Sequence, residues 1–346
     1  MKLIIEGIEI GEGLEPKIIA EIGINHGGDV DVAIQMADAA IDNGAHLIKH
    51  QTHIPDKEMS REAEKAIPGN SHLSIFEIMQ NCHLSEDHEF QLMQHVRSKK
   101  GVFISTPFSR EAADRLESWG VAAYKIGSGE CNNYPFVQYV AKKGKPILLS
   151  TGMNSIESIC RSVEILRSYN VPFALLHTTN LYPTPHHLLR LGALNDMKQA
   201  FPDVPLGLSD HSTSNAACLA SIPLGATVLE RHFTDSKLRE GPDIVCSMDG
   251  NELRDLLSMS REVFQALGGR KEATDQESVT ANFAFASVAT TREISAGEVF
   301  TEENIFPIRP SGGEFGPKDY ESLIGKRATG NLDARVQLRR KDVDAL

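Results

Sequence analysis

Short runs of β-branched and aliphatic residues recur along the chain, and segments of helical length separate them. One such segment, VAIQMADAAIDN, has apolar residues at helical spacing and is followed by Gly44, a usual residue just past a helix C-terminus. Eight strands are expected, near residues 18–23, 46–52, 102–107, 122–128, 146–152, 173–179, 204–210 and 227–233. Strand–helix alternation repeated eight times favours a closed (β/α)8 barrel, a TIM barrel, over an open doubly wound sheet.

Polar or charged residues stand at the C-terminal ends of all eight predicted strands. In chain order they are Glu21; Lys49 and Gln51; Thr106; Lys125 and Ser128; Ser150; His177 and Asn180; Ser209, Asp210 and His211; Glu230 and His232. A single strand that reaches solvent commonly ends on a polar residue. In a closed barrel all eight ends meet on one face, where enzymes of this architecture carry their chemistry. Together the eight ends therefore predict a site.

The last predicted strand, TVLERHF, contains three consecutive ionisable residues in an apolar setting. Buried charges are costly unless they are paired or bind a metal. Strand side chains alternate between faces, so Glu230 and His232 point one way and Arg231 the other. His211 and His232 end neighbouring strands and are candidate ligands of one metal ion. Asp210 and Glu230 lie close enough to act as further ligands or orienting groups, and such a donor set suits Mn²⁺, Fe²⁺ or Zn²⁺.

Two lysines, Lys49 and Lys125, lie inside apolar runs rather than in polar segments. Neutral donors surround them at the other strand ends, and the glycines of KIGSGE let backbone N–H groups approach an oxyanion. Two cations with several hydroxyls and amides predict a cradle for a small phosphorylated carboxylate. A metal acting as a Lewis acid beside this cradle indicates carbonyl chemistry on a phosphorylated substrate.

The pattern changes after residue 280. An apolar, strand-like run at 283–289 is followed by short, turn-rich segments. We therefore expect a barrel domain over 1–280 and a small, mostly-β domain over 281–346. A domain of about sixty residues buries little core by itself, so it is expected to dock onto another surface. The long polar segment 54–75 follows a barrel strand, a place from which loops often cover a site.

Composition narrows the class of protein. The formal net charge of −12 argues against a nucleic-acid-binding surface. Five scattered cysteines, odd in number and without a CxxC pair, are typical of reduced thiols and predict a cytoplasmic protein. No apolar run has membrane length, and the N-terminus lacks the features of a signal peptide. We therefore expect neither a nucleic-acid nor a membrane partner.

Several segments together resemble bacterial N-acetylneuraminate (sialic acid) synthases. They are AEIGINHGG (20–28), KHQTH (49–53), STPFS (105–109), YKIGSGECNNYP (124–135), LSTGMNS (149–155), TTNLYPTP (178–185), GLSDHS (207–212), LERHFTD (229–235) and GPDIVCSM (241–248). They follow one another in order over nearly the whole chain, so the resemblance is far more specific than any one of them. The C-terminal segments resemble the antifreeze-like (SAF) domain that ends these enzymes.

The resemblance implies a reaction. In that family phosphoenolpyruvate condenses with N-acetylmannosamine, with C–O cleavage, to give N-acetylneuraminate and phosphate, and a divalent metal, typically Mn²⁺, is required. By position, His211 and His232 would be the metal ligands. Glu21, Glu230 and Asp210 would be the catalytic carboxylates, and which of them is the base stays open. Phosphoenolpyruvate would be bound by Lys49, Thr106, Lys125, Ser128, Ser150, Asn180 and Ser209. The sugar would be bound by Gln51, Asn70, Tyr182, Asp243 and Arg309.

The resemblance also implies a domain-swapped homodimer. In that family the antifreeze-like domain crosses to the other subunit and covers its active site. Arg309, which precedes a Pro-x-Gly-Gly segment, would then contact the sugar bound by the neighbouring protomer.

Two alternatives stay open at this point. A sister enzyme would make legionaminic acid from a 2,4-diacetamido-trideoxyhexose with the same metal and phosphoenolpyruvate residues. The segments KHQTH and IPGN, followed by SIFEIM, favour the neuraminate group. A non-catalytic ice- or carbohydrate-binding protein is a remote alternative, because the tail carries many charged residues and an ice-binding face should be flat and weakly charged.

Overall fold

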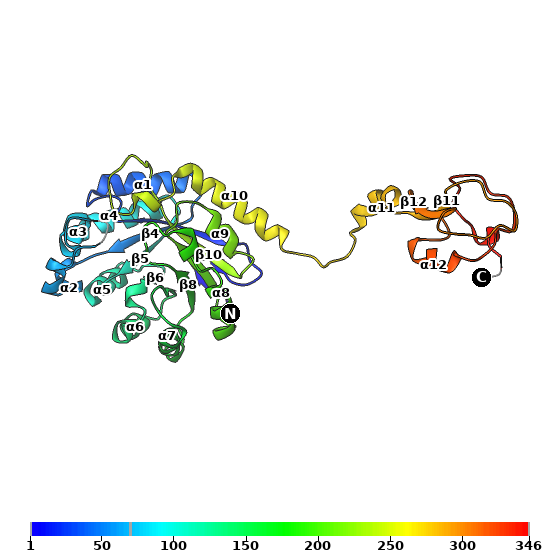
Figure 1. The fold of residues 1–346 in the computed structure, drawn as a ribbon. Coiled ribbons are helices and arrows are strands. Elements are labelled where there is room, and N and C mark those ends of the chain that lie inside the picture. The colour runs from blue at the N-terminus through cyan, green and yellow to red at the C-terminus, as the bar shows by residue number, and fades with distance from the viewer. Residues whose placement is uncertain (1, 69–70, 345–346) are drawn as a thin grey trace. The chain divides into compact units, whose positions relative to one another are not determined.

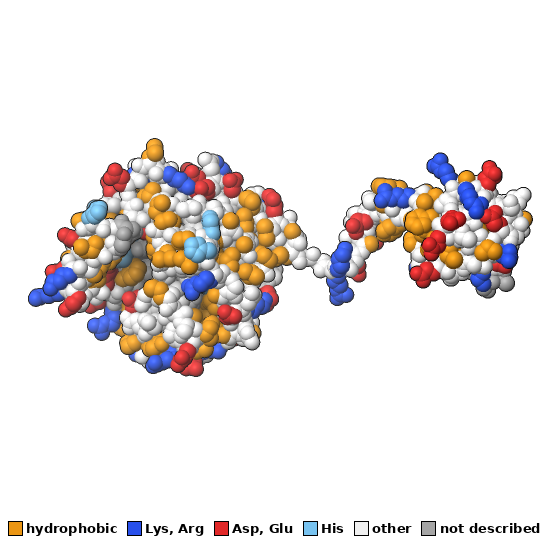
Figure 2. Space-filling model, viewed as in Figure 1, with side chains coloured by type: hydrophobic (Ala, Val, Ile, Leu, Met, Phe, Trp, Pro, Cys, Tyr) orange, Lys and Arg blue, Asp and Glu red, His pale blue; other side chains and the backbone are white. Residues whose placement is uncertain are grey.

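The computed structural model describes residues 2–68 and 71–344. The chain divides into two compact units, the first ending at Gly268 and the second beginning at Gly269 (Figure 1). The boundary predicted at residue 280 falls inside the second unit, within helix α11 (Ser278–Ala284). On the face drawn in Figure 2, acidic and basic side chains are interspersed on both units.

Eight parallel strands close into a barrel in the first unit, in the order β10-β3-β4-β5-β6-β7-β8-β9. They are β3 (Lys17–Gly23), β4 (Leu47–Thr52), β5 (Val102–Pro107), β6 (Tyr124–Ile126), β7 (Ile147–Ser150), β8 (Phe173–Thr178), β9 (Leu206–Asp210) and β10 (Ala226–His232). Each coincides with one predicted strand. Closure through the pairing of β10 with both β3 and β9 confirms the barrel and excludes the open sheet.

Helices cover the outside of the barrel (Figure 1). The helices of this unit are α1 (Val30–Asp42), α2 (Pro55–Glu58), α3 (Ile75–Cys82), α4 (Glu86–Ser98), α5 (Arg110–Ser118), α6 (Tyr134–Ala141), α7 (Ile156–Ser168), α8 (Ala193–Ala200), α9 (Ala216–Ser221) and α10 (Gly250–Ala266), and α3 borders the cavity at the barrel mouth. Local signals set their starts. The Asp29 side chain accepts hydrogen bonds from the first turn of α1, and Asp249 and Glu252 form a capping box on α10. Between helices and strands lies the larger apolar core.

The strands divide their side chains between two environments. Outward residues such as Ile18, Ile48 and Phe103 join the core beneath the helices. Inward residues in the lower half of the barrel, such as Leu47 and Leu148, form a second apolar cluster. Two residues further along each strand the inward positions become polar. The period of two therefore places an apolar layer beneath a polar layer inside one barrel.

An N-terminal hairpin, β1 (Leu3–Ile5) and β2 (Ile8–Ile10), completes the inner cluster. Leu3, Ile5 and Ile10 are buried against the lower inward residues of the barrel strands. The hairpin thus closes the end of the barrel opposite the polar layer. The apolar–polar pattern of the chain did not identify these three-residue strands.

The second unit has its own small core, which includes Phe300, Ile305 and Leu338. It contains α11, the antiparallel pair β11 (Ser287–Thr290) and β12 (Ile305–Ile308), and α12 (Tyr320–Leu323). This confirms the small β-containing domain. The strand predicted from residue 283 is wrong in its first part, because α11 continues to Ala284. A capping box between Thr274 and Glu277 starts the preceding helical turn and favours the helix.

Among the residues that the structure describes, no helix is both long and apolar enough to span a bilayer.

The hairpin should contribute strongly to the stability of the barrel. Ile5→Ala removes a fully buried side chain from the inner cluster, and we expect the free energy of unfolding to fall by about 2–5 kcal/mol. Trp119 is the single tryptophan and packs against the outer core of the barrel unit, so its fluorescence during urea unfolding reports on that unit. Ile4→Ala is the matched control, because Ile4 is 51% exposed on the same strand. Equal effects of both substitutions would contradict this role.

Candidate active site

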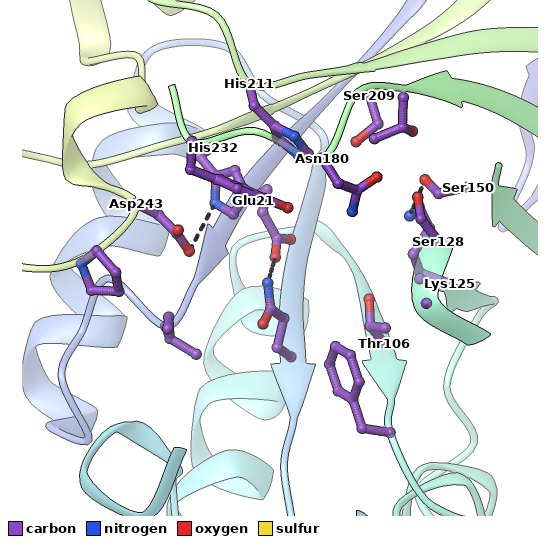
Figure 3. A pocket seen from close by; sticks show the side chains of 18 of the residues that line it. Glu21, Thr106, Lys125, Ser128, Ser150, Asn180, Ser209, His211, His232 and Asp243 are labelled. Carbon is purple, nitrogen blue, oxygen red and sulfur yellow. Dashed lines mark hydrogen bonds and ion pairs between the residues drawn. The ribbon is translucent and has the colours of Figure 1, made fainter. Parts of the chain in front are cut away.

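A cavity of about 340 Å³ opens at the C-terminal ends of the barrel strands (Figure 3). Most of the predicted site residues line it, namely Glu21, Lys49, Gln51, Thr106, Lys125, Ser128, Ser150, Asn180, Tyr182, Ser209, His211, Glu230, His232 and Asp243. They come from seven of the eight strands and from the loops that follow the strands, and the loop after β8 supplies Asn180 and Tyr182. The closed barrel therefore brings together side chains that are far apart in the sequence, as the strand-end pattern predicted.

Two lysines and two glutamates form a buried charge cluster at the floor of the cavity. Lys49 Nζ lies 2.6 Å from Glu21 Oε2 and 3.6 Å from Glu230 Oε1. Lys125 Nζ also lies 3.6 Å from Glu230 Oε1. Each of these side chains is at least nine-tenths buried. Four charges that sum to zero allow the barrel to hold ionised groups where water is scarce.

The cluster shifts the pKa of three of its members. Burial alone would raise the pKa of Glu230, but the ammonium groups of Lys125 and Lys49 outweigh burial and lower it. Burial would lower the pKa of Lys49, but Glu21 and Glu230 raise it. For Lys125 burial prevails, and its pKa is lowered despite Glu230. Lys125 thus has the least negative charge around it, and a bound anion would supply what is missing.

Neutral donors surround the two ammonium groups. Lys49 Nζ donates to Thr106 Oγ1 at 3.2 Å, and Lys125 Nζ donates to Ser150 Oγ at 2.6 Å. Ser128 and Ser209 add two further hydroxyl groups to the cavity wall. This set of cations and hydroxyls can bind the phosphate and carboxylate of one small ligand.

Asn180 completes the cradle, and its side chain lies so close to residue 152 that this residue has to be glycine. Its Oδ1 is buried and has no hydrogen-bond partner. A Cβ on Gly152 would come within 1.9 Å of that oxygen, so only glycine leaves room for the Asn180 side chain. The backbone N–H of Gly152 donates to Ser128 Oγ at 3.0 Å and so positions the neighbouring hydroxyl group.

The two predicted metal ligands lie side by side above the charge cluster. The ring centroids of His211 and His232 are 5.5 Å apart, and Tyr182 stacks on His211 at 4.1 Å. His211 Nδ1 lies 2.9 Å from the carbonyl oxygen of Thr179, which assigns the proton to Nδ1 and leaves Nε2 as a lone pair. Burial, with a contribution from His232, lowers the pKa of His211 to about 3, so its ring is neutral at physiological pH.

These two rings fit a divalent metal that takes few protein ligands. His232 Nδ1 is buried without a hydrogen-bond partner, and Asp243 Oδ2 lies 3.8 Å away. Among the described residues, no group of three or more His, Cys, Asp or Glu side chains is arranged to hold a metal ion. The residues present therefore fit an ion with two imidazole ligands, whose other positions are left to substrate and water.

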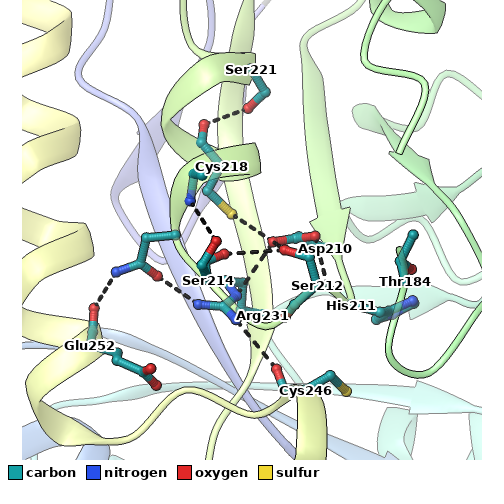
Figure 4. Close-up of polar contacts among 12 residues, drawn as sticks. Thr184, Asp210, His211, Ser212, Ser214, Cys218, Ser221, Arg231, Cys246 and Glu252 are labelled. Carbon is teal, nitrogen blue, oxygen red and sulfur yellow. Dashed lines mark hydrogen bonds and ion pairs between the residues drawn. The ribbon is translucent and has the colours of Figure 1, made fainter. Parts of the chain in front are cut away.

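Asp210 was predicted to belong to the site, and the structure corrects this prediction. It does not line the cavity, because the alternation along β9 points Ser209 inward and Asp210 outward. Its carboxylate lies 3.5 Å from Arg231 Nε and accepts from both the N–H and the hydroxyl group of Ser212 (Figure 4). Arg231 is fully buried and also donates to Asn215 Oδ1. Asp210 and Arg231 thus form a structural pair outside the cavity.

Two other predicted site residues, Asn70 and Arg309, do not belong to the described part of the barrel unit. Asn70 lies outside the described residues. Arg309 belongs to the second unit, where it is exposed. Conversely, Thr178 and Phe108 line the cavity although the sequence analysis did not assign them to it, whereas the strand-end residue His177 points outward to the carbonyl of Leu189. Alternation from the inward Leu176 would have identified Thr178 in place of His177.

Comparison with known proteins finds matches for both units of the chain. A family model described as the NeuB family matches residues 36–272, and the SAF domain matches residues 285–343. The chain is 35% identical to N,N'-diacetyllegionaminic acid synthase of Campylobacter jejuni, over 91% of this chain and 96% of the relative. It is 31% identical to N-acetylneuraminate-9-phosphate synthase of Homo sapiens, over 94% and 92% of the two chains.

A solved structure has the same fold. It is the N-acetylneuraminic acid (sialic acid) synthetase of Leptospira borgpetersenii in complex with citrate, with a TM-score of 0.74 and 28% sequence identity. The match covers 81% of this chain and 95% of that one.

Charge compensation at the floor of the cavity can be tested with Lys49→Met, which keeps the aliphatic stem and removes the ammonium group between Glu21 and Glu230. We expect the free energy of unfolding at pH 7 to fall by about 3–5 kcal/mol, because two buried carboxylates lose a partner. In the wild-type protein the lowered pKa of Glu230 contributes stability above the ordinary carboxyl value of about 4.3, and this is lost as pH falls through the lowered pKa.

In the variant the carboxylates accept protons more readily, so the stability difference between the two proteins should narrow from pH 7 to pH 5 in urea titrations followed by Trp119 fluorescence. Lys99→Met is the control, since Lys99 is exposed and lies 3.4 Å from Asp38 Oδ1. It should change stability by less than about 1 kcal/mol. A loss for Lys49→Met that is the same at both pH values would contradict the electrostatic explanation.

Proposed function

Because this chain belongs to the NeuB family of sialic-acid-type synthases, we propose that it condenses phosphoenolpyruvate with N-acetylmannosamine to give N-acetylneuraminate and phosphate. The observation that carries the proposal is the pair of buried lysines among neutral donors at the barrel mouth. Phosphoenolpyruvate carries its phosphate ester and its carboxylate on the same carbon, so it needs two cationic groups a short distance apart.

The anion side of the cavity binds phosphoenolpyruvate in this proposal. Lys49 and Lys125 neutralise the phosphate and the carboxylate. The hydroxyl and amide groups of Thr106, Ser128, Ser150, Asn180 and Ser209 orient them. Both lysines already contact Glu230, so a bound anion competes with that carboxylate for the same ammonium groups. Binding of the substrate then releases Glu230 to act on the reacting centre.

His211 and His232 would hold the divalent metal, for which we propose Mn²⁺. When bound, it supplies Lewis-acid polarisation of the sugar aldehyde. The neutral ring of His211, fixed by Thr179, presents Nε2 for this purpose. Gln51, Tyr182 and Asp243 line the same side of the cavity and would contact the sugar, together with Asn70.

Glu230 and Glu21 would assist the remaining steps of the reaction. The methylene carbon of phosphoenolpyruvate attacks the aldehyde carbon, and positive charge develops at the enol carbon. Glu230 lies at the floor of the cavity with Oε2 buried and unpartnered, so it can stabilise that charge. Water then adds at the same carbon, and phosphate leaves by C–O cleavage. Glu21, which contacts Lys49 and Gln51, would hold the water and accept its proton.

We also propose that the enzyme is a domain-swapped homodimer that acts in the cytoplasm. The second unit exposes several large apolar side chains, Val279, Phe283, Phe285 and Phe306. A small domain with such a surface needs a partner surface. In the dimer, Arg309 of one copy would reach the sugar bound by the barrel of the other copy. The five cysteines are free, which suits a reducing compartment.

A second candidate reaction is synthesis of N,N'-diacetyllegionaminic acid. The Campylobacter jejuni relative that carries this name is 35% identical over most of the chain. Its sugar would be a 2,4-diacetamido-trideoxyhexose, and the anion and metal residues would serve both reactions equally. The two candidates therefore differ only in the sugar that the cavity accepts.

Phosphate release from phosphoenolpyruvate in the presence of Mn²⁺ tests the reaction and the sugar. We expect faster release with N-acetylmannosamine than with the diacetamido sugar, and we expect EDTA to abolish it. In H₂¹⁸O the label should enter the sugar acid and not the phosphate, because C–O cleavage leaves the bridging oxygen on phosphorus. Preference for the diacetamido sugar would move the function to legionaminate synthesis. No sugar-dependent release with either would overturn the proposal.

Complementation tests the domain exchange together with the metal ligand. His232→Ala should abolish Mn²⁺-dependent turnover, and Arg309→Ala should impair use of the sugar. Random pairing of the two co-expressed variants makes about half of the dimers heterodimers. In each heterodimer one of the two barrels keeps His232 and receives an intact Arg309, so about a quarter of wild-type activity should return. His187→Ala, a change in an exposed histidine outside the cavity, is the control. No recovery beyond that of the separate variants would mean that Arg309 does not act across the dimer.

A further inference from the structure

A line of hydrogen bonds leads from the cavity floor into the loop after β4. Gln51 Nε2 donates to Glu21 Oε1 at 2.7 Å, and Gln51 Oε1 lies 3.0 Å from His53 Nε2. On the other side of the ring, His53 Nδ1 lies 2.9 Å from Glu58 Oε1. His53 is 5% exposed, and Glu58 Oε2 accepts from the backbone N–H of Ile54. His53 itself does not line the cavity, so the proposed reaction gives it no role.

Counting donors and acceptors fixes the proton positions along this line. The carboxylate of Glu21 accepts hydrogen bonds, so the Gln51 amide must turn its NH₂ group toward it. Gln51 Oε1 then faces His53 and needs a donor, which only a protonated Nε2 supplies. The Glu58 carboxylate is an acceptor as well, so the hydrogen bond between Glu58 Oε1 and His53 Nδ1 contains a second proton. The opposite orientation of the amide would set two acceptor oxygens 2.7 Å apart at Glu21.

The His53 ring is held rigidly in place. It stacks on Phe108 with centroids 4.3 Å apart and an angle of 12° between the planes. Phe108 lines the cavity, whereas His53 borders a separate outer hollow of about 180 Å³. The ring therefore stands behind the cavity wall, and its only hydrogen-bonded route to the cavity among the described residues is through Gln51.

We propose that His53 is a positioning residue, which with Glu58 holds the Gln51 amide so that its NH₂ group stays on Glu21. Gln51 is one of the groups proposed to contact the sugar, and Glu21 the one proposed to hold water, so the inference rests on the proposed function. Loss of the donor at Nε2 would free the amide to rotate. The sugar would then meet a misaligned amide, and Glu21 would lose a hydrogen bond.

Paired substitutions separate this role from simple packing. A glutamine side chain places an N–H donor close to the position of Nε2, whereas asparagine reaches only the position of Nδ1. His53→Gln should retain most of kcat/KM for the sugar. His53→Asn and His53→Phe, which lose the donor, should reduce it about 10- to 100-fold. His53→Phe keeps a ring to stack on Phe108. His95→Gln is the control for losing a His–carboxylate pair, because His95 pairs with Asp38 between α1 and α4.

A double-mutant cycle gives the decisive readout. Because His53 acts through Gln51, the variant with both His53→Phe and Gln51→Ala should be no slower than Gln51→Ala alone. Additive losses, or equal losses for His53→Gln and His53→Asn, would show that His53 acts only through the fold and would overturn the inference. Failure of the proposed function is distinguishable, because the wild-type protein would then release no phosphate with either sugar.

Discussion

Two lysines and two glutamates share the inside of a closed barrel, and each carries a charge that burial opposes. Lys49 lies against both carboxylates, whereas Lys125 reaches only Glu230 at 3.6 Å. Burial lowers the pKa of Lys125 despite Glu230, whereas the two carboxylates outweigh burial at Lys49 and raise its pKa. A charge cluster that is neutral overall but short of negative charge at Lys125 is suited to a substrate with two anionic groups, and the catalytic proposal follows from that imbalance.

The barrel architecture limits the free-energy cost of burying such a charge cluster. Alternation along each strand directs every second residue inward, so the lower inward positions can be apolar and the upper ones polar. The hairpin of β1 and β2 seals the apolar end with Leu3, Ile5 and Ile10. The outward residues at the same height, such as Asp210 and Arg231, neutralise each other beneath the helices. Charge is thus balanced separately inside the barrel and on its outer face.

Much of this organisation could be predicted from the sequence. Apolar runs that recur between helical segments, and the polar residues at their ends, identified the barrel and most of the cavity wall. Asp210 was misplaced because a strand pattern leaves the register uncertain by one residue, and one residue reverses the face. The three-residue strands of the hairpin are too short to have a period. The contact between His53 and Gln51 depends on side-chain orientations that no linear pattern encodes.

We propose that the lysine–glutamate cluster is the phosphoenolpyruvate site. Calorimetric titration of phosphoenolpyruvate into the wild-type protein and into Lys125→Met tests it without any sugar or turnover. We predict saturable binding to the wild-type protein and an affinity at least about 100-fold lower in the variant, because one charge-assisted contact to the anion is lost. Binding of equal affinity to a folded Lys125→Met protein would show that the cluster is not the phosphoenolpyruvate site.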